Sequence, residues 1–378
     1  MIVSTTAPAH AQNKIGNVRV AGVDVSGLNQ AQARQRLTRE LASKLNYQHV
    51  LIHGKTAVRR QRRYLGAHLD VDGMVRRALT NKEPRVPLML KINAKALQKS
   101  LHRVAPAFIQ KGRPARVGEW KGKVVIAPEA QWRRLDVSKS VWPLITKWQK
   151  NPGTKYLPVK AITSQPALTA ARLKGVNGVI GRYTTRFNPG NVKRTGNVKL
   201  GIAAIDGALL SPGEVFSLNK TVGERTQKRG YRTTIIFKNS YRAPGIGGGI
   251  SQVTGTLFNA ALLAGLEIVT YQTHSRPVSY IPIGRDATVA WGSFDMKFKN
   301  NTKSPVYIKY KIKGDRATAT LFGRKQKQDV NLKVVQKTLG PQEKKAQLYR
   351  TIRRNGKVVA KQKVGDSHYQ WKEGDWYD

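Results

Sequence analysis

The sequence of 378 residues contains no cysteine. Disulfide bonds, thiolate metal sites and a cysteine nucleophile are therefore excluded. Acidic residues are also scarce, because 21 Asp and Glu stand against 68 Lys and Arg and give a formal net charge of +47. No apolar run reaches the ~20 residues that a membrane-spanning helix needs. The most apolar run, 258–269, is interrupted by Glu267 and predicts a buried helix.

A charge of this size predicts a polyanionic partner or surrounding. Nucleic acid, anionic lipid and the acidic polymers of a bacterial wall all meet that description. Nucleic acid fits poorly, because the basic residues are spread along the whole chain and no basic helix with heptads or RRM-like aromatic signature occurs. We therefore expect a basic surface suited to an acidic envelope and no nucleic-acid partner. The seven histidines are scattered, so we expect no metal site and no cofactor.

The beginning of the chain has two interpretations. The segment Ala7–Gln12 contains an Ala-x-Ala pattern like that before a signal cleavage site, yet no basic start and no apolar core precede it. Residues 1–14 are therefore either the remnant of a signal peptide or a flexible end.

Hydrophobic periodicity and composition divide the rest of the chain into four parts and predict an α+β fold. Strands and helices alternate over 15–150, which predicts an α+β domain. A linker is expected at 151–175. A mixed, largely β domain follows at 176–325, and alternating residues at 326–378 predict a C-terminal β extension. In the first of these domains, we expect Trp132, Trp142 and Trp148 to belong to the core, with sugar stacking as the alternative.

The most informative segment lies in the third part. A strand runs into a glycine-rich loop, and a helix is predicted from Ser251 to about residue 266. Gly247, Gly248 and Gly249 let the backbone turn tightly, and the first-turn amides of the helix then form a site for an anion or oxyanion beside residue 251. Serine is also a preferred helix N-cap, so Ser251 is either a cap or a nucleophile.

The block from about 180 to 322 closely resembles the VanW domain. The matching motifs are contiguous and specific: Ser211–Ser217, Val222–Thr226, Gly245–Gln252, His274–Tyr280 and Gly284–Val289.

The N-terminal segment Gly22–Leu28 resembles peptidoglycan-binding-like modules of Gram-positive surface proteins. The two resemblances together imply a secreted protein of the cell wall or envelope, whose partners are peptidoglycan stem peptides or anionic wall polymers. They leave the oligomeric state open.

Some members of the VanW family look like L,D-transpeptidases, which join peptidoglycan stems through a cysteine thioester. Their pattern reads Gly-Gly-Gly-Ile-Cys-Gln, and in this sequence Ser251 stands in the cysteine position, followed by Gln252. A serine hydroxyl gains little acidity from a helix end and needs a hydrogen-bonded base. The resemblance therefore predicts a binding protein with weak or no catalysis. The alternative is a serine-dependent, L,D-transpeptidase-like acyl transferase.

Four further residues complete the candidate site. His274 is the candidate base and Asp286 its orienting partner, while Arg276 and Arg285 could bind a substrate carboxylate. We place these residues through the family motifs, together with the loop positions Gly247 to Gly249 and Gln252. The structural alternatives are a buried histidine and a carboxylate paired with arginine in the core.

Overall fold

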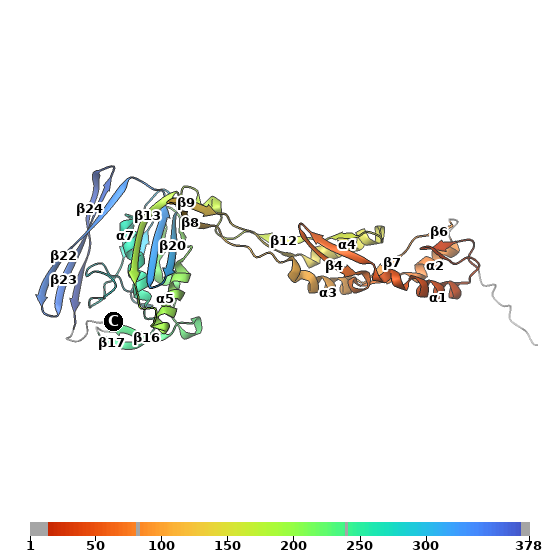
Figure 1. The fold of residues 1–378 in the computed structure, drawn as a ribbon, viewed down its shortest axis with the longest axis horizontal. Helices are drawn as coiled ribbons and strands as arrows, with labels where there is room; N and C mark the ends of the chain where they lie inside the picture. The colour runs from red at the N-terminus through yellow and green to blue at the C-terminus, as the bar shows by residue number, and fades with distance from the viewer. Residues whose placement is uncertain (1–13, 81–83, 239–240, 372–378) are drawn as a thin grey trace, which may run out of the picture. The chain divides into compact units, whose positions relative to one another are not determined.

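The computed structural model describes residues 14–80, 84–238 and 241–371, and these form two compact units (Figure 1). The first unit comprises the described residues of Met1–Arg113 and Ala130–Pro166, and the second those of Pro114–Glu129 and Ala167–Asp378. Residues 114–129 therefore pack with the second unit, although they lie inside the range predicted as one N-terminal domain. Residues 1–13 of the predicted N-terminal remnant lie outside the described residues.

The architecture is α+β with a largely β C-terminal region, as predicted. The helices of the first unit are α1 (Gln30–Leu41), α2 (Val71–Thr80), α3 (Ala94–Val104) and α4 (Val137–Lys150). Its strands are β1 (Arg19–Val20), β2 (Val23–Asp24), β3 (Gln48–His53), β4 (Thr56–Gln61), β5 (Ala67–Leu69), β6 (Arg85–Val86), β7 (Leu90–Ile92), β10 (Trp132–Leu135), β11 (Tyr156–Pro158) and β12 (Ala161–Ser164). The stretch predicted as a linker thus holds β11 and β12, which pair with β3 and β10.

Local sequence explains the start of α1. The side chain of Asn29 accepts a hydrogen bond from Gln32 N, and the Gln32 side chain accepts one from Asn29 N, which forms a capping box. Ala33, Leu37 and Leu41 lie on its buried face, as their spacing predicts.

The tryptophans of the first unit correct one prediction. Trp148 is fully buried, but Trp142 is 68% exposed and Trp132 is 47% exposed, so the expectation that all three are core residues was wrong. The buried face of α4 contains Val141, Ile145 and Trp148. Trp142 follows Val141 directly, and a one-residue step rotates it by about 100° out of that face.

The second unit contains the helices α5 (Val192–Ile205), α6 (Leu218–Val222) and α7 (Ile250–Leu263). Its strands are β8 (Arg116–Trp120), β9 (Lys123–Ala127), β13 (Gly178–Arg186), β14 (Leu209–Leu210), β15 (Val215–Ser217), β16 (Thr233–Lys238), β17 (Tyr241–Ile246), β18 (Glu267–Thr270), β19 (Lys297–Lys299), β20 (Val306–Lys313), β21 (Arg316–Gly323), β22 (Gln328–Gly340), β23 (Glu343–Arg354) and β24 (Lys357–Gln370).

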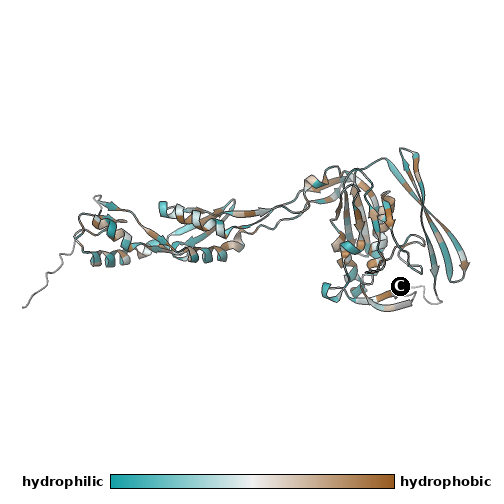
Figure 2. Ribbon diagram, turned by 180° about the vertical axis from the view of Figure 1, so that it is seen from behind, coloured by the Kyte–Doolittle hydropathy of each residue, from teal (hydrophilic) through white to brown (hydrophobic). Residues whose placement is uncertain are grey.

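A four-stranded antiparallel sheet, in the order β13-β21-β20-β14, carries the core of the second unit. Its side chains alternate between two faces: Ile308 and Leu321 pack with α5 and α7, whereas Tyr307 and Phe322 pack with the hairpin β8–β9. Figure 2 shows the hydrophobic residues gathered where α7 meets this sheet. Twelve of the fourteen residues of α7 are buried, and Ser251 in its first turn is only partly buried. The buried helix predicted over 258–269 is correct only up to Leu263, because Glu267–Thr270 form the strand β18.

The predicted C-terminal β extension is confirmed up to residue 371, because β22, β23 and β24 form an antiparallel sheet. This sheet packs against the end of α7. Arg350 Nη1 donates to Leu266 O at 2.7 Å and to Leu262 O at 3.3 Å, and burial lowers the pKa of this guanidinium to about 10. Leu348 belongs to the same core cluster as α7. The C-terminal sheet is therefore an integral part of the second unit.

Across the described ranges, no helix combines the length and the hydrophobicity that crossing a membrane requires.

Candidate functional site

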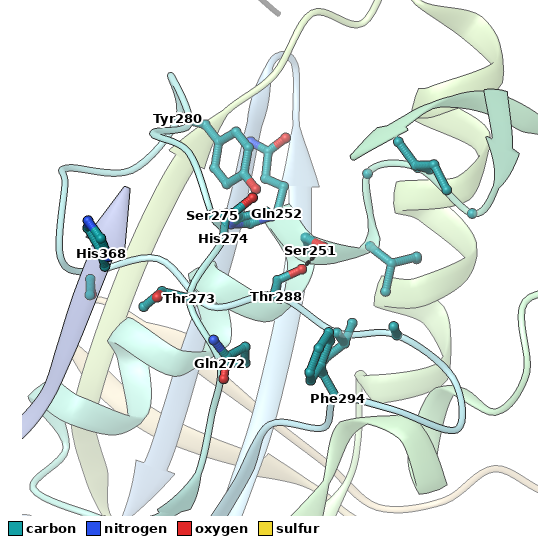
Figure 3. Close-up of a pocket in the computed structure, with 18 of the residues that line it drawn as sticks. Ser251, Gln252, Gln272, Thr273, His274, Ser275, Tyr280, Thr288, Phe294 and His368 are labelled. Carbon is teal, nitrogen blue, oxygen red and sulfur yellow. Dashed lines mark hydrogen bonds between the residues drawn. The ribbon is translucent and has the colours of Figure 1, made fainter. Parts of the chain in front are cut away.

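A cavity of about 1260 Å³ opens in the second unit at the N-terminal end of α7 (Figure 3). Its walls come mainly from four parts of the chain: the glycine loop with the first turn of α7, the hairpin β16–β17, the segment 272–294, and the C-terminal sheet. Arg194 of α5 and the pair Glu224 and Arg225 after α6 complete them. Ser251, Gln252 and His274 line it together with the three glycines, whereas Asp286 lies behind His274. The structure therefore brings together most of the residues singled out in the sequence.

The glycine loop needs glycine for two physical reasons. Gly247 and Gly249 have φ angles of +87° and +102°, which side chains rarely adopt. At Gly248 the obstacle is space, because an added Cβ would lie 2.5 Å from Ile235 O and 2.2 Å from Thr234 Oγ1. The loop therefore passes directly against β16 before α7 begins.

Asn197 of α5 holds this loop in place, although the sequence analysis did not single it out. Its Nδ2 donates to Arg232 O at 3.0 Å and to Gly248 O at 3.1 Å, and its Oδ1 accepts from Arg232 N at 2.8 Å. The side chain is fully buried. An asparagine beside Val198 and Ile202 on the inner side of a helix is the signal that could have identified it.

Ser251 is the second residue of α7, and the N-cap is Gly249. The interpretation of Ser251 as the helix cap was therefore wrong. No side chain of the described residues caps α7. Backbone carbonyls take that place, because Ile250 N donates to Gly247 O and Gln252 N donates to Gly249 O, both at 3.2 Å, so these two amides do not form the expected anion site. The Ser251 hydroxyl lies 3.0 Å from Thr288 Oγ1. Figure 3 shows this hydrogen bond on the same wall as His274. The Ser251 hydroxyl is therefore hydrogen-bonded to Thr288, and not to the histidine that was predicted as its base.

His274 and Asp286 form a buried pair. His274 Nδ1 lies 2.7 Å from Asp286 Oδ2, and the same oxygen accepts from His274 N at 2.8 Å. The two residues are 7% and 1% exposed. Because Nδ1 contacts the carboxylate, Nε2 is the ring nitrogen left for other partners. The pair has the geometry expected of a base and its orienting group.

Gln252 has a different environment from that of an oxyanion donor. Its Nε2 donates to Arg186 O at 2.6 Å and to Thr185 Oγ1 at 3.1 Å, while its Oε1 accepts from Arg194 Nη1 at 2.9 Å. It is 1% exposed. Its side chain joins α7 to β13 and to the start of α5.

The two arginines chosen as carboxylate ligands do not line the cavity. Arg276 is 3% exposed. Arg285 Nε donates to Asn259 Oδ1 at 2.8 Å, and its guanidinium lies 5.1 Å from the centre of the Tyr183 ring. Among the described residues, the arginines in the wall are Arg194 and Arg225 instead. Motif position alone could not predict which arginines line the cavity, because this depends on which side of each segment faces the cavity.

The remaining walls contrast with each other. Exposed apolar side chains line one rim and come from the hairpin and from the loop after Thr288: Ile235, Ile246, Trp291 and Phe294. The C-terminal sheet supplies polar groups, among them Lys337, Lys345, Asp366 and His368. No sequence motif pointed to a residue of this sheet. No group of three or more His, Asp or Glu able to hold a metal ion occurs among the residues that the structure describes.

A nearly buried helix starts from a glycine loop at a large cavity, beside a hydroxyl residue and a buried histidine–aspartate pair. Residues 193–322 match the family model described as "VanW like protein", so this part of the chain is a VanW-like domain, as its motifs indicate. The match does not include residues 15–150, whose resemblance to peptidoglycan-binding modules stays a prediction.

Two curated relatives match part of the chain. "Uncharacterized protein YoaR" of Bacillus subtilis (strain 168) is 44% identical over 143 residues, which is 38% of this chain and 47% of that protein. "Vancomycin B-type resistance protein VanW" of Enterococcus faecalis (strain ATCC 700802 / V583) is 28% identical over 137 residues, 35% of this chain and 50% of that protein. The chain thus spans about half the length of the curated relatives it matches. No solved structure matches it.

Proposed function

We propose that this protein acts in the bacterial cell envelope and that the cavity of its second unit binds a peptidoglycan stem peptide with weak or no catalysis. The observation that carries the proposal is the cavity itself. Its volume of about 1260 Å³ exceeds the 300–1,000 Å³ typical of small-molecule sites. A cavity of that size has room for several residues of a peptide.

The charges in the wall suit such a peptide. Arg194 and Arg225 lie on one side, with Glu224 nearby, and Lys345 and Asp366 lie on the C-terminal sheet. Stem peptides carry carboxylate and ammonium groups, and arginine binds carboxylates in a defined geometry. Burial lowers the pKa of Arg225; its ordinary value is so high that the group remains charged at neutral pH.

The apolar rim suits the rest of the ligand. Trp291 and Phe294 are 50% and 48% exposed, and both line the cavity. Exposed apolar side chains gathered around a concave site favour ligand binding. They would pack against the small side chains and the sugar of a wall fragment.

The expectation of weak catalysis rests on Ser251. Its hydroxyl is hydrogen-bonded to Thr288 Oγ1, which is no base at neutral pH, whereas an active serine needs a base in hydrogen-bond reach. Attachment to anionic wall polymers would come from the net charge of +47, and screening by salt should weaken it.

Peptide binding is tested by titrating the full chain with a soluble stem peptide in a calorimeter. Trp291→Ala is expected to weaken binding about tenfold, as truncation of a buried aromatic contact does. Trp120→Ala is the matched control, since Trp120 is 69% exposed in the same unit and does not line the cavity. No measurable binding by the unchanged protein, or equal losses in both variants, would remove the proposal.

Wall attachment needs a separate test. The protein is sedimented with purified peptidoglycan and with whole wall that retains its acidic polymer, at low and at moderate salt. Attachment through charge predicts more protein on whole wall and a loss at moderate salt. Equal absence from both pellets at low salt would contradict an envelope role.

A second candidate is a serine-dependent, L,D-transpeptidase-like acyl transferase, and the buried His274–Asp286 pair favours it. In this scheme the Ser251 hydroxyl turns from Thr288 towards His274. Ser251 Oγ would attack a peptide carbonyl carbon while Nε2 takes the hydroxyl proton and passes it to the leaving amine. A second amine would then attack the ester carbonyl carbon and lose its proton to Nε2. Nε2 passes that proton to Ser251 Oγ as the carbon–Oγ bond breaks, which forms the new amide and restores the hydroxyl.

Mass spectrometry of muropeptides separates the two candidates. Cross-linked or exchanged stems that disappear in Ser251→Ala would favour the transferase. Ser251→Cys restores a thiol, whose ordinary pKa of ~8.5 is lowered by a helix end and a histidine. Products formed only by that variant would mean that the cavity is competent and only the nucleophile is changed.

A further inference from the structure

We infer that the C-terminal sheet is a working part of this site, and that Tyr369 of β24 is a positioning residue that fixes Asp286 and, through it, the His274 ring. This inference rests on the function proposed for the cavity, and it assigns a role to residues beyond the range that matches the VanW family model.

Tyr369 contacts the pair directly. Its hydroxyl donates to Asp286 Oδ1 at 2.5 Å and accepts from Gly284 N at 2.8 Å. The side chain is fully buried. Burial and the neighbouring Asp286 carboxylate raise the pKa of this phenol, so it is protonated at neutral pH and acts as a donor.

The carboxylate of Asp286 is therefore held from two sides. Oδ1 accepts from Tyr369, and Oδ2 accepts from the ring and the backbone of His274. A carboxylate that is 1% exposed needs such donors, because an uncompensated buried charge is costly. With Oδ1 fixed, rotation of the carboxylate is blocked and Oδ2 stays in line with His274 Nδ1.

The sheet that carries Tyr369 is itself anchored. Ala346, Tyr369 and Trp371 form a small core cluster with Ile283 of the segment that leads to Asp286. Gly284, with φ +80°, lies so close that an added Cβ would be 2.9 Å from Val334 Cγ1. The position of Asp286 thus depends on the packing of β22–β24 against residues 283–286.

Other titratable groups around the pair are few in the described ranges. The Tyr271 hydroxyl is buried, and burial followed by the charges of Asp286 and Asp366 raises its pKa to about 12. His368 lines the cavity near the sheet and bonds Glu343. Neither replaces the hydrogen bond from Tyr369 to Oδ1.

The test is nuclear magnetic resonance of the full chain, without any ligand, on the His274 Nδ1 proton, assigned with His274→Gln. Tyr369→Phe removes the donor to Oδ1 and is expected to accelerate exchange of this proton with water at least about tenfold, because a hydrogen bond to a charged group is among the stronger ones in a protein. Tyr349→Phe is the matched control: it lies on β23, and its hydroxyl bonds Gln347 Oε1 at 3.0 Å. It should leave the exchange unchanged.

Backbone amides of β24 provide the internal reference. If they exchange as before while the ring proton accelerates, Tyr369 acts on the pair. Unchanged ring-proton exchange in Tyr369→Phe, or an acceleration matched by the amides of β24, would overturn the inference. Because no peptide is added, failure of peptide binding in the calorimeter leaves this result intact, and the two proposals fail separately.

Discussion

Removal of the Asn197 side chain should loosen the glycine loop more than its small size suggests. Asn197→Ala deletes three hydrogen bonds, two to carbonyls and one from an amide. Each contributes about 0.5–1.5 kcal/mol, and buried groups left without partners cost about 1–3 kcal/mol each. Partial rescue by water reduces the sum. We expect a loss of about 3–5 kcal/mol in the free energy of unfolding of the second unit, a large share of the ~5–15 kcal/mol of a typical domain.

Urea denaturation followed by tryptophan fluorescence measures this loss. Asn191→Ala is the matched control on the same helix. Asn191 caps α5 by accepting from Arg194 N at 3.2 Å at an exposed site, so its loss should cost only ~1 kcal/mol. Asn197→Asp retains the acceptor for Arg232 N but places oxygen against two carbonyls, and it should be no more stable than the alanine variant. The reasoning is refuted if Asn197→Ala is no more destabilising than Asn191→Ala.

Three further predictions concern stability. Gly248→Ala should shift the urea midpoint down, with a loss of about 2–4 kcal/mol, because its Cβ would lie 2.5 Å from Ile235 O; Gly196→Ala, where nothing lies within 4 Å, should not. Arg350→Met should cost about 2–3 kcal/mol by thermal unfolding, since Arg350 bonds the carbonyls of Leu262 and Leu266; equal stability would contradict the docking of the sheet. Burial lowers the pKa of His49 from 6.5 to about 4, so below pH 6.5 the unfolded first unit binds a proton that the folded unit does not. The free energy of unfolding of the first unit should therefore be highest above pH 6.5 and fall by up to about 3 kcal/mol as the pH drops towards 4. Urea midpoints between pH 7 and 4 measure this fall, with exposed His102→Gln as the variant that should retain it.

Much of the fold followed from local patterns. The spacing of Ala33, Leu37 and Leu41 predicted α1. The apolar run 258–269 predicted the buried second half of α7 but missed the strand β18 at its end. Alternation near the end of the chain predicted the C-terminal strands. These patterns are readable because helix and strand periodicity is a property of consecutive residues. The exposed position of Trp142 was missed, since large apolar side chains are not always buried.

The residues of the candidate site could be predicted only where they belong to recognisable sequence motifs. Ser251, His274 and the glycines do line one cavity, and Asp286 does contact His274. The cations were misplaced, because Arg276 and Arg285 lie inside the motifs 274–280 and 284–289 but do not line the cavity. Sequence spacing gives proximity along the chain and says little about the direction of a side chain in an irregular loop.

The sequence by itself determined that a glycine loop leads into an apolar helix beside a hydroxyl residue, and that acidic groups are too few to balance the positive charge. Only the tertiary structure decided which partners those groups have. Ser251 is hydrogen-bonded to Thr288, 37 residues away in the sequence, and Asp286 is hydrogen-bonded to Tyr369, 83 residues away. The second of these contacts depends on the packing of β22–β24 against α7 and the segment 283–286. That packing depends on the burial of side chains from distant elements, and no local periodicity records it.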